Sequence, residues 1–182
     1  MRYFAQFILL FLLSASIAFA SIGHISALNG DVSIVRDTKT IKAKAGSELE
    51  KSDVVKSSVG SVAQLVFNDK TIITVGSNTV FSIKEYIYDD KTPNAKFGVE
   101  KGYFKTVTGQ IGKVAPDKFK LETKTATLGI RGTEFKGFVD ESGNLFTVTT
   151  KGKTVVTSNI PNVPTSSTEV PAGYMTKATV KG

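Results

Sequence analysis

Arg131 is the side chain whose neighbours most suggest chemistry, because it lies between two glycines, Gly129 and Gly132. Its guanidinium carries five N–H donors in a fixed fork and could hold a carboxylate of a ligand or partner. The alternative is a structural role, in which Arg131 ties a turn to neighbouring strands through Glu122 or Glu134. A charged group beside apolar neighbours must be paired to be tolerated, so we favour the structural interpretation.

No group of residues in the sequence forms a recognisable metal site. His24 is the only histidine, and its place near the start of the chain predicts an exposed first strand. A single imidazole cannot make a metal site alone. Four aspartates could supply oxygen to calcium, but they lack the spacing of an EF-hand loop, so we interpret them as turn formers. These are Asp31, Asp69, Asp89 and Asp90. We expect no metal and no other cofactor.

The sequence also lacks the patterns typical of an enzyme active site. Ser–His–acid chemistry would depend on His24, and no serine lies in a Gly-x-Ser-x-Gly turn. A Gly-rich phosphate loop is absent as well. Glu85 and Glu134 lie in apolar runs that could raise a carboxyl pKa, which leaves a hydrolase with spatially paired carboxylates as one hypothesis. The favoured prediction is that the protein is not an enzyme.

Alternating apolar and polar residues, rich in β-branched and aromatic types, run through the chain after residue 21. Residues 62–67 and 71–75 predict two strands joined by a turn at 68–70, and 140–144 predicts another hairpin turn. Residues 145–150 and 153–157 predict a further pair joined by a turn at Lys151 and Gly152. The other expected strands are 22–28, 32–36, 79–84, 103–108, 119–123, 133–139 and 174–180.

These strands predict an all-β domain. Turn signals recur about every 8–12 residues, the spacing of sandwiches, barrels and β-solenoids, and no segment carries a helical stripe over three turns. The number of short strands favours a twisted β-sandwich or β-solenoid-like domain, with an open barrel as the alternative. We expect a polar surface loop at 88–96 and a long proline-containing loop at 158–171, since proline cannot donate to a sheet.

The N-terminus reads as a secretory signal peptide covering residues 1–20. Arg2 supplies a positive charge, residues 4–13 are apolar except for Gln6, and Ala18 and Ala20 present the small-x-small cleavage pattern. Cleavage before Ser21 would leave one domain, 21–182. The alternative, an uncleaved membrane anchor, is near the lower length limit for a spanning helix. We therefore expect export to the periplasm, or beyond it, with no transmembrane anchor after cleavage.

Net charge and the absence of cysteine limit the classes of partner and of metal site that the protein can have. The net charge is +7, or +6 without Arg2. The lysines are scattered singly rather than in a basic block, and export removes the protein from cytoplasmic nucleic acid, so we expect no nucleic-acid partner. Attraction to anionic polymers of the envelope or to lipid headgroups is the alternative interpretation of this charge. Without cysteine there are no disulfides or thiolate metal sites, and the core must stabilise the fold.

Several short motifs together resemble the FecR domain family. Its Arg-Gly-Thr-x-Phe element corresponds to Arg131, Gly132, Thr133 and Phe135, following Gly129. We expect these residues to act structurally, with Gly132 at positive φ and Thr133 reopening the strand. The remaining matches are 29–36 with the opening strands, 46–55 with a turn, 61–72 with the central hairpin, and 151–155 and 170–173 with the closing strands.

The resemblance implies a periplasmic β-rich binding module. In well-known members this module belongs to a membrane-anchored regulator that relays the state of an outer-membrane transporter to a sigma factor. We find no sequence for a sigma-binding domain here, so we expect the binding module without direct control of a sigma factor.

Two non-enzymatic functions stay open beside the hydrolase hypothesis. The favoured one is an interaction module in envelope signalling or assembly that binds another envelope protein through a sheet face or strand edge. The alternative is a module that binds peptidoglycan or another glycan, although the absence of tryptophan argues against a sugar-stacking cleft. The tyrosines that motivate it are Tyr86, Tyr88, Tyr103 and Tyr174.

Overall fold

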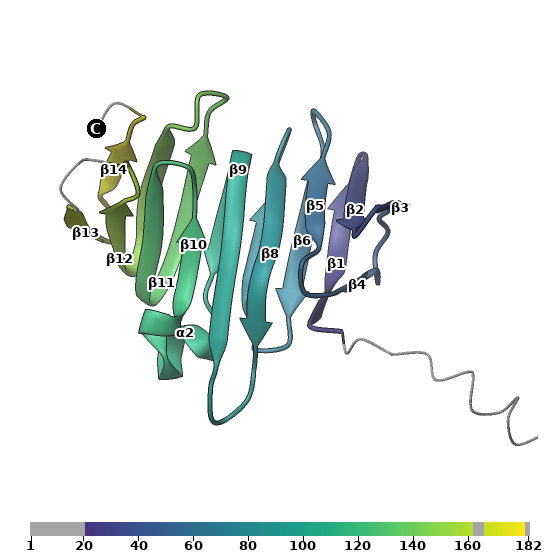
Figure 1. Ribbon diagram of the computed structural model, residues 1–182, viewed down its shortest axis with the longest axis horizontal. Coiled ribbons are helices and arrows are strands. Elements are labelled where there is room, and N and C mark those ends of the chain that lie inside the picture. The colour runs from purple at the N-terminus through teal and green to yellow at the C-terminus, as the bar shows by residue number, and fades with distance from the viewer. Residues whose placement is uncertain (1–20, 162–165, 181–182) are drawn as a thin grey trace, which may run out of the picture.

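Fourteen strands pair into one continuous sheet that bends back on itself (Figure 1). The computed structural model describes residues 21–161 and 166–180, so the expected signal peptide lies outside the described residues. The prediction of an all-β domain with many strands is confirmed. The strands are β1 (Gly23–Asn29), β2 (Val32–Arg36), β3 (Lys39–Lys42), β4 (Glu48–Leu49), β5 (Val54–Ser57), β6 (Val62–Phe67), β7 (Ile72–Val75), β8 (Val80–Ile87), β9 (Asn94–Val107), β10 (Phe119–Glu122), β11 (Ala126–Val139), β12 (Leu145–Ser158), β13 (Ser167–Pro171) and β14 (Met175–Ala178).

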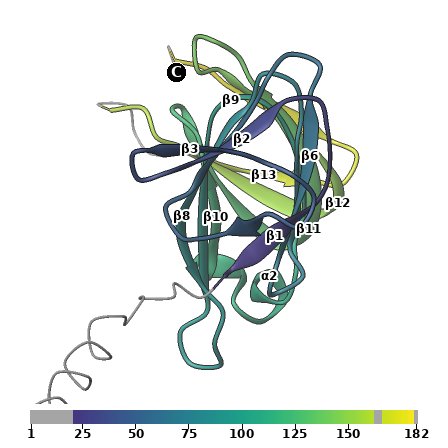
Figure 2. The ribbon, with the colours of Figure 1, turned by 90° about the vertical axis from the view of Figure 1, so that its right-hand side faces the viewer.

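The sheet forms two layers because three long strands pass from one layer into the other. The first half of β9 pairs with β8 and β10, whereas its second half pairs with β7 and β11. In the same way β12 pairs with β14 near its start and with β13 near its end. One layer thus continues through β8, β5, β2 and β3, and the other through β7, β6, β1 and β4. Figure 2 shows the layers from the β1–β4 end of the molecule.

Aromatic side chains join the two layers in the core. Phe67 of β6 and Phe97 of β9 come from different layers, and their ring centroids are 4.9 Å apart. Phe97 also contacts Phe81 and Phe119, each with centroids 5.6 Å away. All four rings are fully buried. Each such ring removes a large apolar area from water, so this cluster contributes strongly to the stability of a domain without disulfides.

The turn expected at Lys151 and Gly152 is wrong, because β12 runs through it without a break. Gly152 has φ +74° and Gly132, on the neighbouring β11, has φ +59°. The register between the two strands shifts between Arg131 and Glu134. A bulge of this kind bends a strand while its pairing continues. The glycines therefore let β11 and β12 pass together from one layer to the other instead of ending in a hairpin.

The other turn predictions agree more closely with the structure. The turn at 68–70 joins β6 to β7, and 140–144 joins β11 to β12. The loop between β8 and β9 covers 88–93, shorter than the expected 88–96. The proline-containing range 158–171 includes an edge strand, β13, which pairs with β12. The described helices are short: α2 (Ile111–Val114) and one 3-10 turn at Pro116–Lys118.

Asp69 anchors the β6–β7 turn to the segment that leads into α2. Its buried carboxylate accepts hydrogen bonds from the Thr71 amide (3.0 Å) and hydroxyl (2.8 Å), from the Ile111 amide (3.1 Å) and from the Tyr86 hydroxyl (3.1 Å). Burial raises the pKa of Tyr86, so this hydroxyl stays protonated and can donate. Asp69 is fully buried, and these donors take the place of a cation in satisfying its charge.

A second buried carboxylate, Asp53, fixes the turn before β5. The Arg36 guanidinium makes two hydrogen bonds to it, from Nε to Oδ1 and from Nη2 to Oδ2, each 2.8 Å long. The amide of Glu50 donates to Asp53 Oδ2 at 2.8 Å, and Arg36 also pairs with the Glu50 carboxylate. A two-pronged pair of this geometry holds β2 against the turn between β4 and β5.

Candidate functional site

A row of three aromatic side chains lies across neighbouring strands on the outer surface of one layer. Tyr103 of β9 is opposite Phe138 of β11, which in turn is opposite Phe146 of β12. Side chains of directly paired residues project from the same face of a sheet. The residues beside them in the chain, Phe104 and Leu145, project the other way and are buried. We call this row the aromatic face.

The rings of the aromatic face stack on one another and remain accessible to solvent. The centroids of Tyr103 and Phe138 are 4.3 Å apart with the planes inclined at 24°, and those of Phe138 and Phe146 are 6.4 Å apart at 26°. Tyr103 is 54% exposed and Phe146 is 37% exposed. Large apolar side chains gathered in one place on a soluble domain mark a binding surface more often than isolated ones do.

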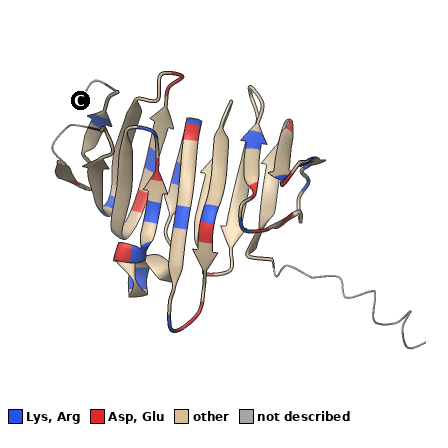
Figure 3. Ribbon diagram, in the orientation of Figure 1, with Lys and Arg blue, Asp and Glu red and all other residues tan. Residues whose placement is uncertain are grey.

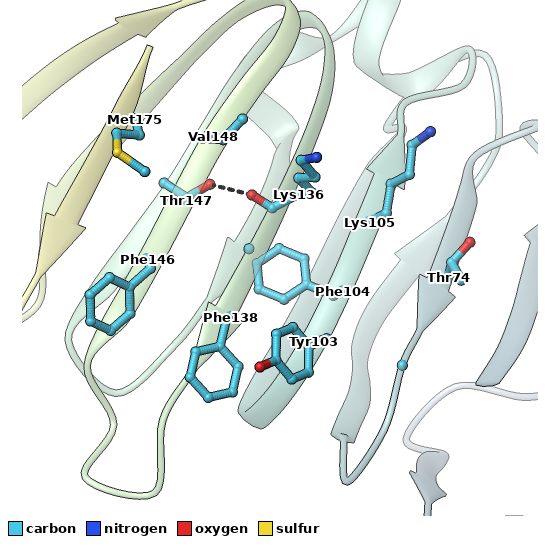
Figure 4. Close-up of a pocket in the computed structure, with 12 residues that line it drawn as sticks. Thr74, Tyr103, Phe104, Lys105, Lys136, Phe138, Phe146, Thr147, Val148 and Met175 are labelled. Atoms are coloured by element: carbon cyan, nitrogen blue, oxygen red, sulfur yellow. Dashed lines mark hydrogen bonds between the residues drawn. The ribbon is translucent and has the colours of Figure 1, made fainter. Parts of the chain in front are cut away.

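The aromatic face borders a groove of about 370 Å³ (Figure 4). The groove continues along the strands to the next row of paired residues, Thr74, Lys105, Lys136, Val148 and Met175. Met175 is 74% exposed, and its flexible thioether can adapt to differently shaped partners. Gly76 lies beside Tyr103, where an added Cβ would come within 3.0 Å of the Tyr103 Cβ. The absence of a side chain at Gly76 keeps this end of the groove open.

Lysines rather than acids surround the groove. Lys177 lies over the Phe146 ring, with Nζ 4.9 Å from the ring centroid. Lys105 forms an ion pair with Glu134, in which Nζ lies 2.7 Å from Oε1. The hydrogen bond from Lys105 lowers the pKa of Glu134. A general acid of a hydrolase needs a raised pKa, and the pKa of Glu134 beside Lys105 is shifted in the opposite direction.

The Arg-Gly-Thr-x-Phe residues lie where β11 passes between the layers. Phe135 is buried and packs edge-on against Phe104, with centroids 6.1 Å apart at 78°. The Thr133 amide donates to Thr108 Oγ1 (3.1 Å), and its hydroxyl donates to the Lys153 carbonyl (2.8 Å). Gly132 has the expected positive φ.

The remaining two positions of this motif differ in what the structure describes. Gly129 pairs with Lys120 of β10 and Val155 of β12. The side chain of Arg131 is outside the described part of the structure. Of its two expected partners, Glu122 pairs with Lys84 (2.9 Å) and Lys96 (3.1 Å), and Glu134 pairs with Lys105. Burial favours a raised pKa at Glu122, but the two lysines outweigh it and lower the pKa.

The single histidine and the aspartates form no site. His24 is exposed on β1, as expected. Asp89 accepts hydrogen bonds from the amides of Thr92 and Lys91, which lower its pKa, and so acts as a turn former. Within residues 21–161 and 166–180, no cluster of three or more His, Cys, Asp or Glu side chains could hold a metal ion.

The four tyrosines that suggested a glycan site are separated in the structure. Tyr86 is buried and bonded to Asp69, so it belongs to the core. Tyr88 follows β8, Tyr174 precedes β14 and Tyr103 belongs to the aromatic face. Phe138, Phe146 and Met175 were not predicted from the sequence. Only the register of β9, β11, β12 and β14 brings them beside Tyr103.

Two crystal structures share this fold. Each is of a candidate anti-sigma factor from Parabacteroides distasonis, with TM-scores of 0.55 and 0.54 and 14% sequence identity. The matches cover 71% of this chain and 55% and 56% of the other chains, so this chain spans about half of their length. Identity at this level establishes similarity of fold alone. Comparison with curated proteins finds no match.

The sequence matches a protein-family model over more than half of its length. The model is that of the FecR protein, and it matches residues 53–155. This range begins at the buried Asp53, includes the Arg-Gly-Thr-x-Phe residues and ends within β12. In the described residues, no helix is long and apolar enough to cross a membrane. Because the family model covers more than half of the chain, the chain belongs to the FecR protein family.

Proposed function

We propose that this protein is an exported, non-catalytic binding module that takes part in signalling or assembly at the cell envelope by docking another protein on its aromatic face. The observation that carries the proposal is the stacked row of Tyr103, Phe138 and Phe146 beside an open groove. Aromatic residues and methionine are enriched at the centres of protein interfaces. A cluster of exposed apolar side chains is typical of a surface that a partner covers.

The family and the fold of the protein also support a role in binding another protein. The protein belongs to the FecR family, and two solved structures that share its fold are of candidate anti-sigma factors, a description that implies a protein partner. The apolar N-terminal segment with its Ala18-Phe19-Ala20 pattern supports a place in the periplasm. An interaction module in this compartment needs neither a cofactor nor a buried catalytic pair.

The geometry favours a protein partner over a glycan. A sugar ring binds to the free flat face of an aromatic side chain, but the faces of Tyr103 and Phe138 are turned toward each other at 4.3 Å. Lys177 covers the Phe146 ring. What the row offers to a ligand is mainly ring edges, together with the flexible side chain of Met175. Such a surface suits interdigitating apolar side chains of a protein better than a stacked sugar.

Chemical crosslinking in a bacterial periplasm tests the proposal. The chain carries an affinity tag, cells are treated with a crosslinker, and the recovered material is identified by mass spectrometry beside an unrelated tagged periplasmic domain. We expect one dominant envelope protein in the sample that is missing from the control. Recovery of cell-wall material alone, released by raised salt, would replace the proposal with glycan binding, and recovery of nothing beyond the control would refute it.

A further inference from the structure

The groove beside the aromatic face carries more positive charge than negative charge. Lys105, Lys136 and Lys177 are exposed around it. Lys105 is paired with Glu134. Among the ion pairs of the described residues, none involves Lys136 or Lys177. The rim of the groove is therefore left with two cations that a partner can pair.

The two lysines without an ion pair are placed to act together with the rings. Lys136 is two residues before Phe138 on β11, so the two side chains project from the same face about 7 Å apart along the strand. Lys177 is directly opposite Phe146 on β14. The ammonium groups thus flank the row of rings from two sides. A segment seated on the rings would bring its own neighbouring side chains within reach of both lysines.

Charge also argues against a second copy of this chain as the occupant. The protein has a net charge of +7, and Figure 3 shows lysines and arginines spread over its strands. Two copies joined through the aromatic face would bring Lys136 and Lys177 of each against the same cations of the other. Like charges placed together across an interface oppose association.

We infer that the segment docked on the aromatic face is an acidic segment of a partner protein, in which large apolar side chains enter the groove and carboxylates pair with Lys136 and Lys177. This inference rests on the proposed function and adds the chemistry of the partner to it. It follows the usual arrangement of an interface, in which an apolar centre is surrounded by a charged rim. The cations steer the partner toward the rings and fix its register, and the rings hold it.

Direct binding of synthetic peptides tests the inference. The probes are three ten-residue peptides in which leucine and phenylalanine alternate with glutamate, with glutamine or with lysine, and fluorescence anisotropy measures binding to the full chain at low salt. We expect the glutamate peptide to bind at least about tenfold more tightly than the glutamine peptide. We expect raised salt to weaken its binding, because the paired charges are partly exposed.

Charge-reversed variants assign the effect to the two lysines. Lys136→Glu combined with Lys177→Glu should weaken the glutamate peptide at least about tenfold and should make the lysine peptide the preferred one. Lys136→Arg with Lys177→Arg should retain binding of the glutamate peptide. Lys39→Glu with Lys42→Glu is the matched control, because both lysines are exposed on β3, far along the sheet from the groove.

The outcomes separate this inference from the function on which it rests. Equal binding of the glutamate and glutamine peptides, unchanged by charge reversal but lost when the aromatic face is replaced, would overturn the acidic partner and leave the docking surface standing. Binding that persists without the aromatic face would overturn both. A dimer of the unmodified chain in sedimentation velocity, dissociated by replacing the aromatic face, would make a second copy the occupant and overturn the inference.

Discussion

Replacing Tyr103, Phe138 and Phe146 together with threonine is expected to weaken binding of the partner protein by at least about 100-fold, while the protein stays folded. Aromatic side chains at the centre of an interface commonly contribute about 2 kcal/mol or more each when truncated. The three side chains project outward, so their removal leaves no cavity in the core. Threonine suits an exposed strand position, and the lost ring contacts should cost the fold only about 0.5–1.5 kcal/mol per pair.

The matched control removes a similar amount of exposed apolar surface elsewhere. Val59, Ile87 and Tyr88 are 82%, 45% and 49% exposed and lie away from the groove. Their replacement with threonine should leave the recovery of crosslinked partner unchanged. Equal recovery with both triple variants would contradict the assignment of the aromatic face. An unchanged circular dichroism spectrum, with a cooperative melting transition well above the temperature of the binding experiment, excludes unfolding as the cause of lost binding.

Replacing Asp69 with alanine is expected to lower the free energy of unfolding by about 3 kcal/mol or more. The substitution leaves the Thr71 and Ile111 amides without their buried acceptor, and each unsatisfied buried donor costs about 1–3 kcal/mol. Tyr86 loses its acceptor at the same time. The β6–β7 turn would then be released from the segment that leads into α2. Urea denaturation, followed by circular dichroism, measures the change.

Two further variants serve as controls for the Asp69→Ala variant. Asp90→Ala removes an exposed carboxylate from the β8–β9 loop and should change the free energy of unfolding by less than about 0.5 kcal/mol. Asp69→Asn keeps one oxygen acceptor and should be less destabilising than the alanine variant. A loss below about 1 kcal/mol for Asp69→Ala would mean that the carboxylate is not the anchor that its hydrogen bonds indicate.

Local patterns were sufficient to predict the class of the fold. Alternation of β-branched and apolar residues in 62–67 and 71–75, with polar residues between them, predicts the β6–β7 hairpin that the structure contains. The same reasoning failed at Lys151 and Gly152. A glycine can open a hairpin or a bulge, and only pairing with β11 decides between them. Pairing partners more than a few residues apart are not encoded in a local pattern.

The aromatic face could not be predicted for a related reason. Each of its rings lies close in sequence to another apolar residue: Tyr103 precedes Phe104, Phe146 follows Leu145, and Phe138 precedes Val139. In such pairs one side chain enters the core and the other faces solvent, and the sequence does not say which. The structure shows Phe104, Leu145 and Val139 buried. Sequence periodicity therefore identified the strands but not the surface that they form together.

Photo-crosslinking from the aromatic face tests the central claim most directly. A benzophenone amino acid replaces Phe146, which is 37% exposed, and in a second version replaces Ile87, which is 45% exposed on β8. Irradiation in the periplasm should join the Phe146 version, and not the Ile87 version, to one envelope protein. Adducts of equal yield from both positions, or adducts from Ile87 alone, would contradict docking on the aromatic face.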